Sequence, residues 1–335
     1  METSIINTNE PDEIIPVEDW DVIPQSAMES TDKPFIQANT VESSLAEIRE
    51  KHIIPVFIKD NEPVINHGDF IEATSEVLSD IFYAEAILKP KIRLSHPIKG
   101  RIPEAKDKPA RELLPHEETL YYERMAFIIE IPTIHEFING QQLSLTVGGV
   151  KAYNLDNLYN RKGTDEHFKI FIGFQNRVCT NLCVSTDGYL ADARVKNLSQ
   201  LKAIMSDMFS RYNAVKHFEK LNEFTGYFLT EQQFALLLGR CRMYQHLPQH
   251  LKSDIPPLLL GDTQLGMVCR DYYRDNSFCR DEQGNINLWQ LYNLFTGANK
   301  STYIDNFLDR SVNAFQFTEE LRLALENKGL SWFLS

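Results

Sequence analysis

The sequence lacks the motifs that mark the common enzyme classes. It contains no Walker A loop, no GxGxxG turn, no HExxH and no GxSxG. Each of these spacings places phosphate-binding amides, metal ligands or a nucleophile, so their absence counts against ordinary NTPases, dinucleotide enzymes, zincins and α/β-hydrolases. We therefore assign no catalytic residue, no cofactor and no metal from the sequence, and we expect a protein that is not an enzyme.

Long apolar runs and regularly spaced cysteines are missing as well. No stretch approaches the roughly 20 apolar residues that span a bilayer, and residues 1–12 have neither the basic start nor the apolar core of a signal peptide. The five cysteines stand at irregular spacings, which favours reduced, buried thiols over a disulfide framework. These features predict a cytoplasmic protein with no membrane contact.

Negative charge is concentrated at the start of the chain. The protein has 335 residues and a net charge of −13, and residues 1–51 contain 12 acidic and only 3 basic side chains. This segment has scattered prolines and no sustained apolar period, so it cannot bury enough surface to offset its ordering entropy. We expect residues 1–50 to form an acidic disordered tail and residues 51–335 to form a single domain.

Alternating apolar residues predict a β-rich region over residues 53–196. Met125, Phe127 and Ile129 are the clearest case, because a period of two places them on one face of a strand. Gly148 and Gly149 separate two such runs, and we interpret them as a tight turn or a bulge. The predicted strands cover residues 124–131, 142–147, 150–153, 168–174, 178–184 and 189–195.

A period near 3.6 predicts a helical layer over residues 198–330. Leu198, Leu201 and Met205 begin an apolar stripe that continues to Tyr212. Thr230, with a glutamine three residues later, has the pattern of a capping box. Further helices are predicted over residues 69–82, 263–273, 288–296, 302–312 and 318–327. The predicted fold class is α+β, with a largely antiparallel sheet and a C-terminal helical layer.

A basic, proline-rich arm interrupts this acidic protein. Prolines recur every six or seven residues from Pro90 to Pro115, which favours an extended arm, and residues 89–111 contain eight basic and two acidic side chains. Extended cations with nearby aromatic rings suit single-stranded nucleic acid, whose phosphates pair with the cations while its bases stack. The alternative is a solvated loop that balances the acidic tail. The predicted nucleic-acid-binding residues are Lys89, Lys91, Arg93, Lys99, Arg101, Tyr121, Tyr122 and Arg177.

Cys179 and Cys183 form the one closely spaced cysteine pair. Zinc needs four ligands and no second cluster accompanies the pair, so we expect both thiols to pack in the core without metal. Three polar residues beside Cys179 leave open an enzyme of unrecognised type. They are Asn176, Arg177 and Asn181.

Several long strings resemble an uncharacterised bacterial family that is known only as a domain of unknown function. The strings are IRLSHPIKGRIPEA, ELLPHEETLYYERMAFIIEIP, LTVGGVKAYNLDNLY and EHFKIFIGFQNRVCTNLCV, and the resemblance covers about residues 40–333. A weaker resemblance connects Arg177–Asn181 and residues 287–296 to the phage/plasmid-like protein family, although the His-Asp-Gly element of that family is absent before Cys179. The resemblance implies a chromosomal, phage, plasmid or integrative-element context and no established chemistry.

The leading hypothesis from the sequence is a non-enzymatic protein of a mobile element that binds single-stranded nucleic acid and forms a homo-oligomer. A protein–protein interaction module is the first alternative, and the enzyme with a polar site near Cys179 is the second. A contiguous basic groove would favour nucleic acid. A pocket with convergent polar groups would favour an enzyme, and an exposed apolar patch would favour a protein partner.

Overall fold

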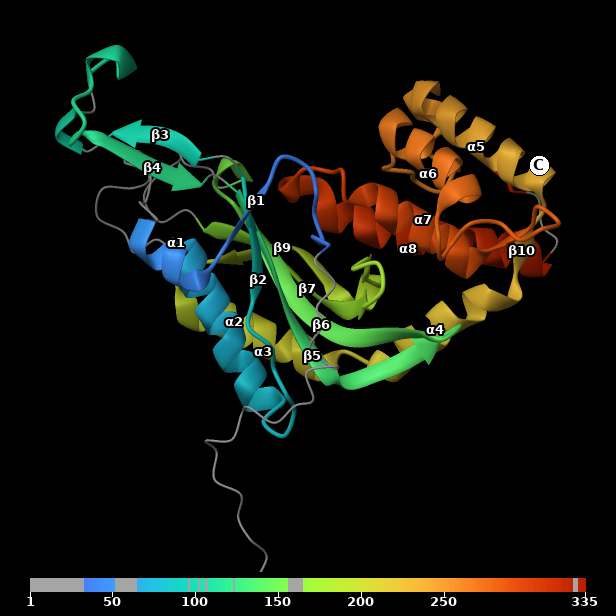
Figure 1. The fold of residues 1–335 in the computed structure, drawn as a ribbon, viewed down its shortest axis with the longest axis horizontal. Helices are drawn as coiled ribbons and strands as arrows, with labels where there is room; N and C mark the ends of the chain where they lie inside the picture. The colour runs from blue at the N-terminus through green and yellow to red at the C-terminus, as the bar shows by residue number, and fades with distance from the viewer. Residues whose placement is uncertain are drawn as a thin grey trace, which may run out of the picture. The chain divides into compact units, whose positions relative to one another are not determined.

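The computed structural model describes residues 33–51, 65–95, 97–101, 103–105, 108–122, 124–155, 165–327 and 331–335. Its centre is a seven-stranded antiparallel sheet in the order β1-β2-β5-β6-β7-β8, with β9 also paired to β7 (Figure 1). The strands are β1 (Val41–Ser43), β2 (Lys91–Leu94), β5 (Arg124–Ile138), β6 (Gln141–Ala152), β7 (Glu166–Asn176), β8 (Leu182–Cys183) and β9 (Tyr189–Val195).

Helices cover both faces of this sheet, which is why its central strands bury almost every side chain. On one face, Phe127 and the other apolar side chains that point to the same side of the sheet pack against α2 (His67–Ile81) and α3 (Leu198–Arg211). On the other face, Ile128 and Phe171 pack against α8 (Ile304–Asn327). Figure 1 shows this layering. The predicted α+β class with a largely antiparallel sheet is confirmed.

The prediction of a turn or bulge at Gly148 and Gly149 was wrong. Both residues lie inside β6 and pair in register with β5 and β7. A Cβ atom on Gly148 would lie 2.1 Å from the Phe127 carbonyl oxygen, and one on Gly149 would lie 2.5 Å from Phe70 Cζ. The glycines therefore let a neighbouring strand and an aromatic ring approach closely. The β5–β6 turn lies instead at Asn139–Gly140, where φ is positive at both residues.

The C-terminal part consists mainly of helices. They are α4 (Ala214–Glu223), α5 (Glu231–His246), α6 (Asp262–Arg274), α7 (Leu288–Asn299) and α8, with a short ribbon of β10 (Phe228–Leu229) and β11 (Ile286–Asn287). The Thr230 capping box is present at the start of α5. α7 is buried along most of its length and packs against α6 and α8. None of the described helices combines the length and apolar content that crossing a membrane requires.

The helices predicted over residues 302–312 and 318–327 are one helix, α8, which begins at Ile304. The expected interruption falls at residues 313–317, which continue the helix of α8. Asn313 lies in this stretch and accepts a hydrogen bond from Leu259 N at 2.7 Å while donating to Pro257 O at 2.7 Å. The polar side chain of Asn313 therefore binds the loop that precedes α6, and the helix continues through this position.

Residues 33–51 are part of the packed fold, although the sequence placed the end of the tail near residue 50. They contain β1 and α1 (Leu45–Lys51). Phe35 and Ile36 are buried against α8. The acidic composition of the surrounding segment gave no sign of this burial. Residues 1–32, where the rest of the predicted tail lies, are outside the described residues.

The basic arm is extended over its strands, as its prolines predict. It contributes β2 to the large sheet and then forms β3 (Pro97–Arg101), which pairs with β4 (Glu118–Tyr122) as a separate two-stranded ribbon. Between these strands are two short 3-10 turns, η2 (Pro103–Ala105) and η3 (Ala110–Glu112). The ribbon therefore gives the arm an antiparallel partner of its own.

Candidate functional site

The predicted nucleic-acid-binding residues divide into separate groups. In the arm, Lys89 is exposed and Lys91 is half-buried on β2. Arg93 on the same strand donates from Nε to Thr40 Oγ1 at 3.0 Å and from Nη2 to Thr40 O at 2.9 Å, and its side chain is only 14% exposed. The guanidinium of Arg93 therefore fastens the segment before β1 to β2.

The β3–β4 ribbon brings four of the predicted residues together in the backbone. Lys99 and Arg101 are on β3, and Tyr121 and Tyr122 are on β4, where the backbone of Ile98 faces Tyr121 and that of Pro97 faces Tyr122. The ribbon adjoins the end of the large sheet at which β5 begins, with Arg124 opposite Ala152.

Arg177 is at the other end of the sheet. It follows β7, whose last residue Asn176 pairs with Leu143, near the start of β6. The Arg177 Nε lies 3.6 Å from Glu130 Oε1. The structure therefore does not bring Arg177 to the ribbon, and the eight predicted residues do not form one strip.

The polar residues around Cys179 form a junction between the β7–β8 turn and α7. The side chain of Asn176 accepts a hydrogen bond from Val178 N at 3.0 Å, which shapes the turn. Asn181 Nδ2 donates to Asn293 O on α7 at 2.9 Å, and Cys179 Sγ lies 3.9 Å from Asn293 Oδ1. Thr180, between them, has a positive φ of 58°.

Lys300, which the sequence did not suggest, completes this junction. Its Nζ donates to Cys179 O and, at 2.8 Å, to Thr180 Oγ1, while its own carbonyl accepts from Gln37 N at 2.8 Å. Burial lowers the pKa of Lys300 to about 8 and raises the pKa of Cys179 to about 11. Cys179 is thus a protonated thiol at neutral pH, and a thiol is a poor nucleophile. The hydrogen bonds of Lys300 therefore join the end of α7 to the β7–β8 turn and to the segment that precedes β1.

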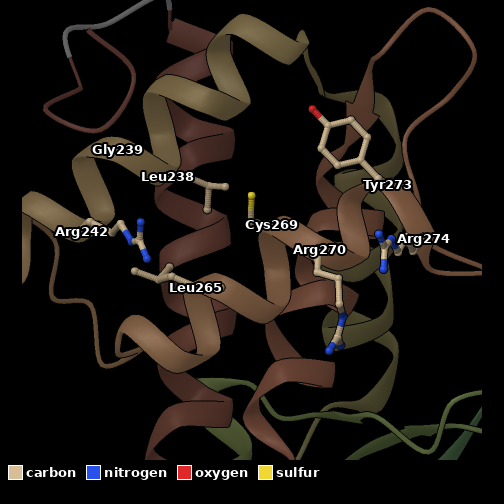
Figure 2. Close-up of a pocket in the computed structure, with 9 residues that line it drawn as sticks. Leu238, Gly239, Arg242, Leu265, Cys269, Arg270, Tyr273 and Arg274 are labelled. Carbon is tan, nitrogen blue, oxygen red and sulfur yellow. The ribbon is translucent and has the colours of Figure 1, made fainter.

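A groove lies between α5 and α6. It has a volume of about 650 Å³ and runs beside the two helices (Figure 2). The lining residues are Leu238, Gly239 and Arg242 of α5 and Leu265, Gly266, Cys269, Arg270, Tyr273 and Arg274 of α6.

Two glycines lie inside the helices that form the groove. Both are exposed, and a Cβ added to Gly239 or Gly266 would meet no described atom within 4 Å. A glycine in a helix interior costs roughly 1 kcal/mol relative to alanine. No contact inside the described chain accounts for that cost here.

Three arginines are among the residues that line the groove. Figure 2 shows Arg242 at one side and Arg270 with Arg274 at the other, with Leu238, Leu265 and Cys269 between them. Arg242 Nε lies 3.3 Å from Asp262 Oδ1, and Arg270 makes hydrogen bonds of 2.6 and 2.8 Å to the neighbouring Asp271. Arg274 has no ion-pair partner in the described part of the chain. Two of the three arginines are thus paired with carboxylates, and the floor between them is apolar.

Tyr273 gives the groove a rigid aromatic edge. Its hydroxyl donates to Glu231 Oε1 at 2.6 Å, the guanidinium of Arg280 lies 5.3 Å from its ring centroid, and about half of the side chain remains exposed. The hydrogen bond to Glu231 raises the pKa of Tyr273. An oriented, half-exposed ring is typical of a contact residue in a binding surface.

The chain matches a known protein family over most of its length. Residues 17–334 match the family described as "Domain of unknown function, B. Theta Gene description (DUF3871)". The chain belongs to this family. No curated protein and no solved structure matches it. The resemblance to an uncharacterised domain family is therefore confirmed, and the wider similarity to phage/plasmid-like proteins stays a prediction.

The DUF3871 match includes both helices of the groove, the β3–β4 ribbon and the Cys179 junction. Sequence reasoning identified the ribbon and the junction but missed the groove. The available signal was a glycine inside each helical pattern, with an arginine three residues after Gly239 and four residues after Gly266. Only the packing of α5 beside α6 shows that these two signals meet.

Proposed function

We propose that this DUF3871 protein is a protein-interaction module that binds a segment of a partner protein in the α5–α6 groove. The observation that carries the proposal is the pair of helix-interior glycines, Gly239 and Gly266, whose missing side chains keep the groove open. A helix with no side chain at the contact point lets a partner backbone approach closely. The glycines then serve a contact made outside the described chain.

The side chains around the glycines support a peptide ligand. Leu238 and Leu265 give the groove an apolar floor, and Tyr273 and the arginines stand at its edges. Tyr and Arg are enriched in protein interfaces, where they surround an apolar centre. Leu236 and Met243, also on α5, are exposed apolar side chains.

The test is a selection from a displayed peptide library on the full chain. Enriched peptides should bind the wild-type protein and lose binding when Gly239 and Gly266 are both changed to Leu, because the new side chains fill the groove. Gly226→Leu is the matched control, since a side chain there also meets no atom within 4 Å but lies outside the groove. Peptides that bind the Gly239→Leu/Gly266→Leu protein as well as the wild type would refute the proposal.

Binding of single-stranded nucleic acid is the second candidate, and the β3–β4 ribbon is the observation that favours it. The ribbon places the backbones of Lys99 and Arg101 beside a strand that carries Tyr121 and Tyr122. Phosphates would pair with the cations and bases would stack on the rings. This candidate also carries the predicted role in a phage, plasmid or integrative element.

Fluorescence anisotropy with a labelled single-stranded oligonucleotide tests this candidate. Affinity should fall steeply with salt and weaken in a Lys99→Ala/Arg101→Ala variant. The control is Arg211→Ala/Lys220→Ala, which removes two cations from α3 and α4. Equal losses in the two double variants would mean that only net charge matters, and the ribbon would then have no specific role.

A further inference from the structure

We infer that the groove binds an amphipathic helix that carries carboxylates four residues apart beside an apolar seam. The inference rests on the proposed function and adds the chemistry of the partner. Two features of the groove carry it, namely its apolar floor beside α6 and the spacing of Arg270 and Arg274 along that helix.

The shape of the groove suits a helix. α6 has 13 residues, and a helix of that length is about 20 Å long. Helices pack side by side when the ridges of one enter the groove of another, and small residues at the contact bring the axes closer. Gly239 and Gly266 are such residues, and each lies inside its helix, away from the ends. A partner helix of three to four turns would cover the lining residues.

The arginines beside the floor select an acidic flank on that helix. Arg270 and Arg274 are four residues apart on α6, so they lie one turn apart on one side of it, whereas Arg242 lies beside Asp262 at the start of α6. Carboxylates spaced four residues apart on a partner helix would match the pair on α6, and an arginine can hold a carboxylate in a bidentate geometry. Arg274 has no ion-pair partner among the described residues, so it is available.

The partner's apolar seam has a counterpart beside the arginines. Leu238 and Leu265 form the floor, and the exposed thiol of Cys269 lies between the arginines in Figure 2. A nucleic-acid backbone would place phosphates along this apolar strip. It would also meet the carboxylates of Asp262 and Asp271, which already pair with two of the arginines. Discrete carboxylates beside an apolar seam therefore match the groove better than a continuous polyanion does.

The experiment uses three labelled helical peptides with one shared leucine seam and with Glu, Gln or Lys on the flanks. Their binding to the full chain is measured by fluorescence anisotropy. The Glu peptide should bind about tenfold more tightly than the Gln peptide, and raised salt should reduce this difference, because exposed ion pairs are screened. The Lys peptide should show no binding at a protein concentration of about 100 µM.

Charge reversal provides the decisive comparison. Arg270→Glu/Arg274→Glu should lose the Glu peptide and gain the Lys peptide, and this gain also shows that the variant is folded. The control, Arg194→Glu/Arg211→Glu, changes charge to the same extent on β9 and α3 and should behave like the wild type.

Three outcomes would overturn the inference. If all three peptides bind equally and lose binding in Gly239→Leu/Gly266→Leu, the groove binds peptides but not through carboxylates, and the proposed function survives. If the Glu peptide does not bind at all, the helix chemistry is wrong, and the library selection still decides the proposed function. If a single-stranded oligonucleotide displaces the Glu peptide and loses affinity in Arg270→Glu/Arg274→Glu, the groove is a nucleic-acid site.

Discussion

The glycines of the sheet and those of the α5–α6 groove have opposite surroundings. At Gly148 and Gly149 in β6, an added Cβ would collide with a backbone carbonyl or an aromatic ring, so the fold itself requires glycine there. At Gly239 and Gly266, an added Cβ would meet no described atom within 4 Å, although both helices would be more stable with alanine. A residue that weakens its own helix without relieving a clash points to a contact outside the chain.

Polar groups show the same contrast. At the Cys179 junction, the ammonium group of Lys300 is buried and is held by Cys179 O and Thr180 Oγ1. In the groove, the side chains of Arg242 and Arg270 are exposed and pair with carboxylates next to them on the surface. Buried polar groups must be hydrogen-bonded to be tolerated, whereas exposed pairs exchange partners at little cost. The junction therefore stabilises the fold, and the groove is available to a ligand.

The largest effect should come from Gly148→Ala. The new methyl group would lie 2.1 Å from Phe127 O and 2.9 Å from Phe171 Cε1, and the first of these is backbone that cannot move without opening the β5–β6 ladder. We expect a loss of about 3 kcal/mol in the free energy of unfolding. Urea denaturation of Gly148→Ala and Gly239→Ala measures the contrast directly. Equal midpoints for the two variants would show that crowding does not distinguish the two regions.

Acid should also destabilise the crowded interior, through His217. This side chain is buried beside the rings of Phe174 and Phe315, and its Nδ1 lies 2.6 Å from the Tyr212 hydroxyl oxygen. Burial lowers the pKa of His217 from 6.5 to about 3, and the charge of Lys220 adds to this effect. The unfolded chain therefore binds a proton at His217 below pH 6.5, whereas the folded chain binds it only below about pH 3.

The free energy of unfolding should consequently fall as the pH drops below 6.5, by about 3 kcal/mol at pH 4. Denaturant melts between pH 7 and pH 4 measure this slope. His217→Gln should flatten it, whereas His246→Gln, which changes an exposed histidine at the end of α5, should leave it unchanged. An identical slope in the wild type and in His217→Gln would assign the acid sensitivity to other groups.

The fold was largely predictable because period and capping are local signals. Alternation over residues 125–131 and the Thr230 capping box each act within a few residues, and both are present as predicted. The turn predicted at Gly148–Gly149 was wrong because a glycine pair is a local turn signal. The glycines are needed there because Phe70 and Phe127, which are distant in sequence, approach them closely. The Asn139–Gly140 turn carries such a local signal, because both residues tolerate the positive φ that they adopt, but it was not among the predicted turns.

The sites were less predictable because they depend on which elements meet. Charge counting identified the arm as basic, but the hydrogen bonds of Arg93 to Thr40 depend on the pairing of β1 with β2. Lys300 reaches the Cys179 turn across 120 residues of sequence separation. In the groove, Arg242 and Arg270 belong to different helices, and neither helix alone shows that their arginines line one surface. Such juxtapositions have no counterpart in a single local pattern.

The smallest effect is expected from Gly266→Ala, and it tests the contrast most directly because its two consequences have opposite signs. Alanine fits the open space and restores helix propensity, so the free energy of unfolding should rise by about 0.5–1 kcal/mol. The same methyl group projects into the groove, so affinity for groove-binding peptides should fall several-fold.

Ala235→Gly, an exposed position of α5 outside the groove, is the reverse control and should lower stability without changing affinity. Thermal melts and peptide titrations of these two variants give four measurements. A Gly266→Ala protein that is more stable and binds peptide as well as the wild type would mean that this glycine serves no partner, because a close contact at Gly266 cannot accommodate the added methyl group without loss.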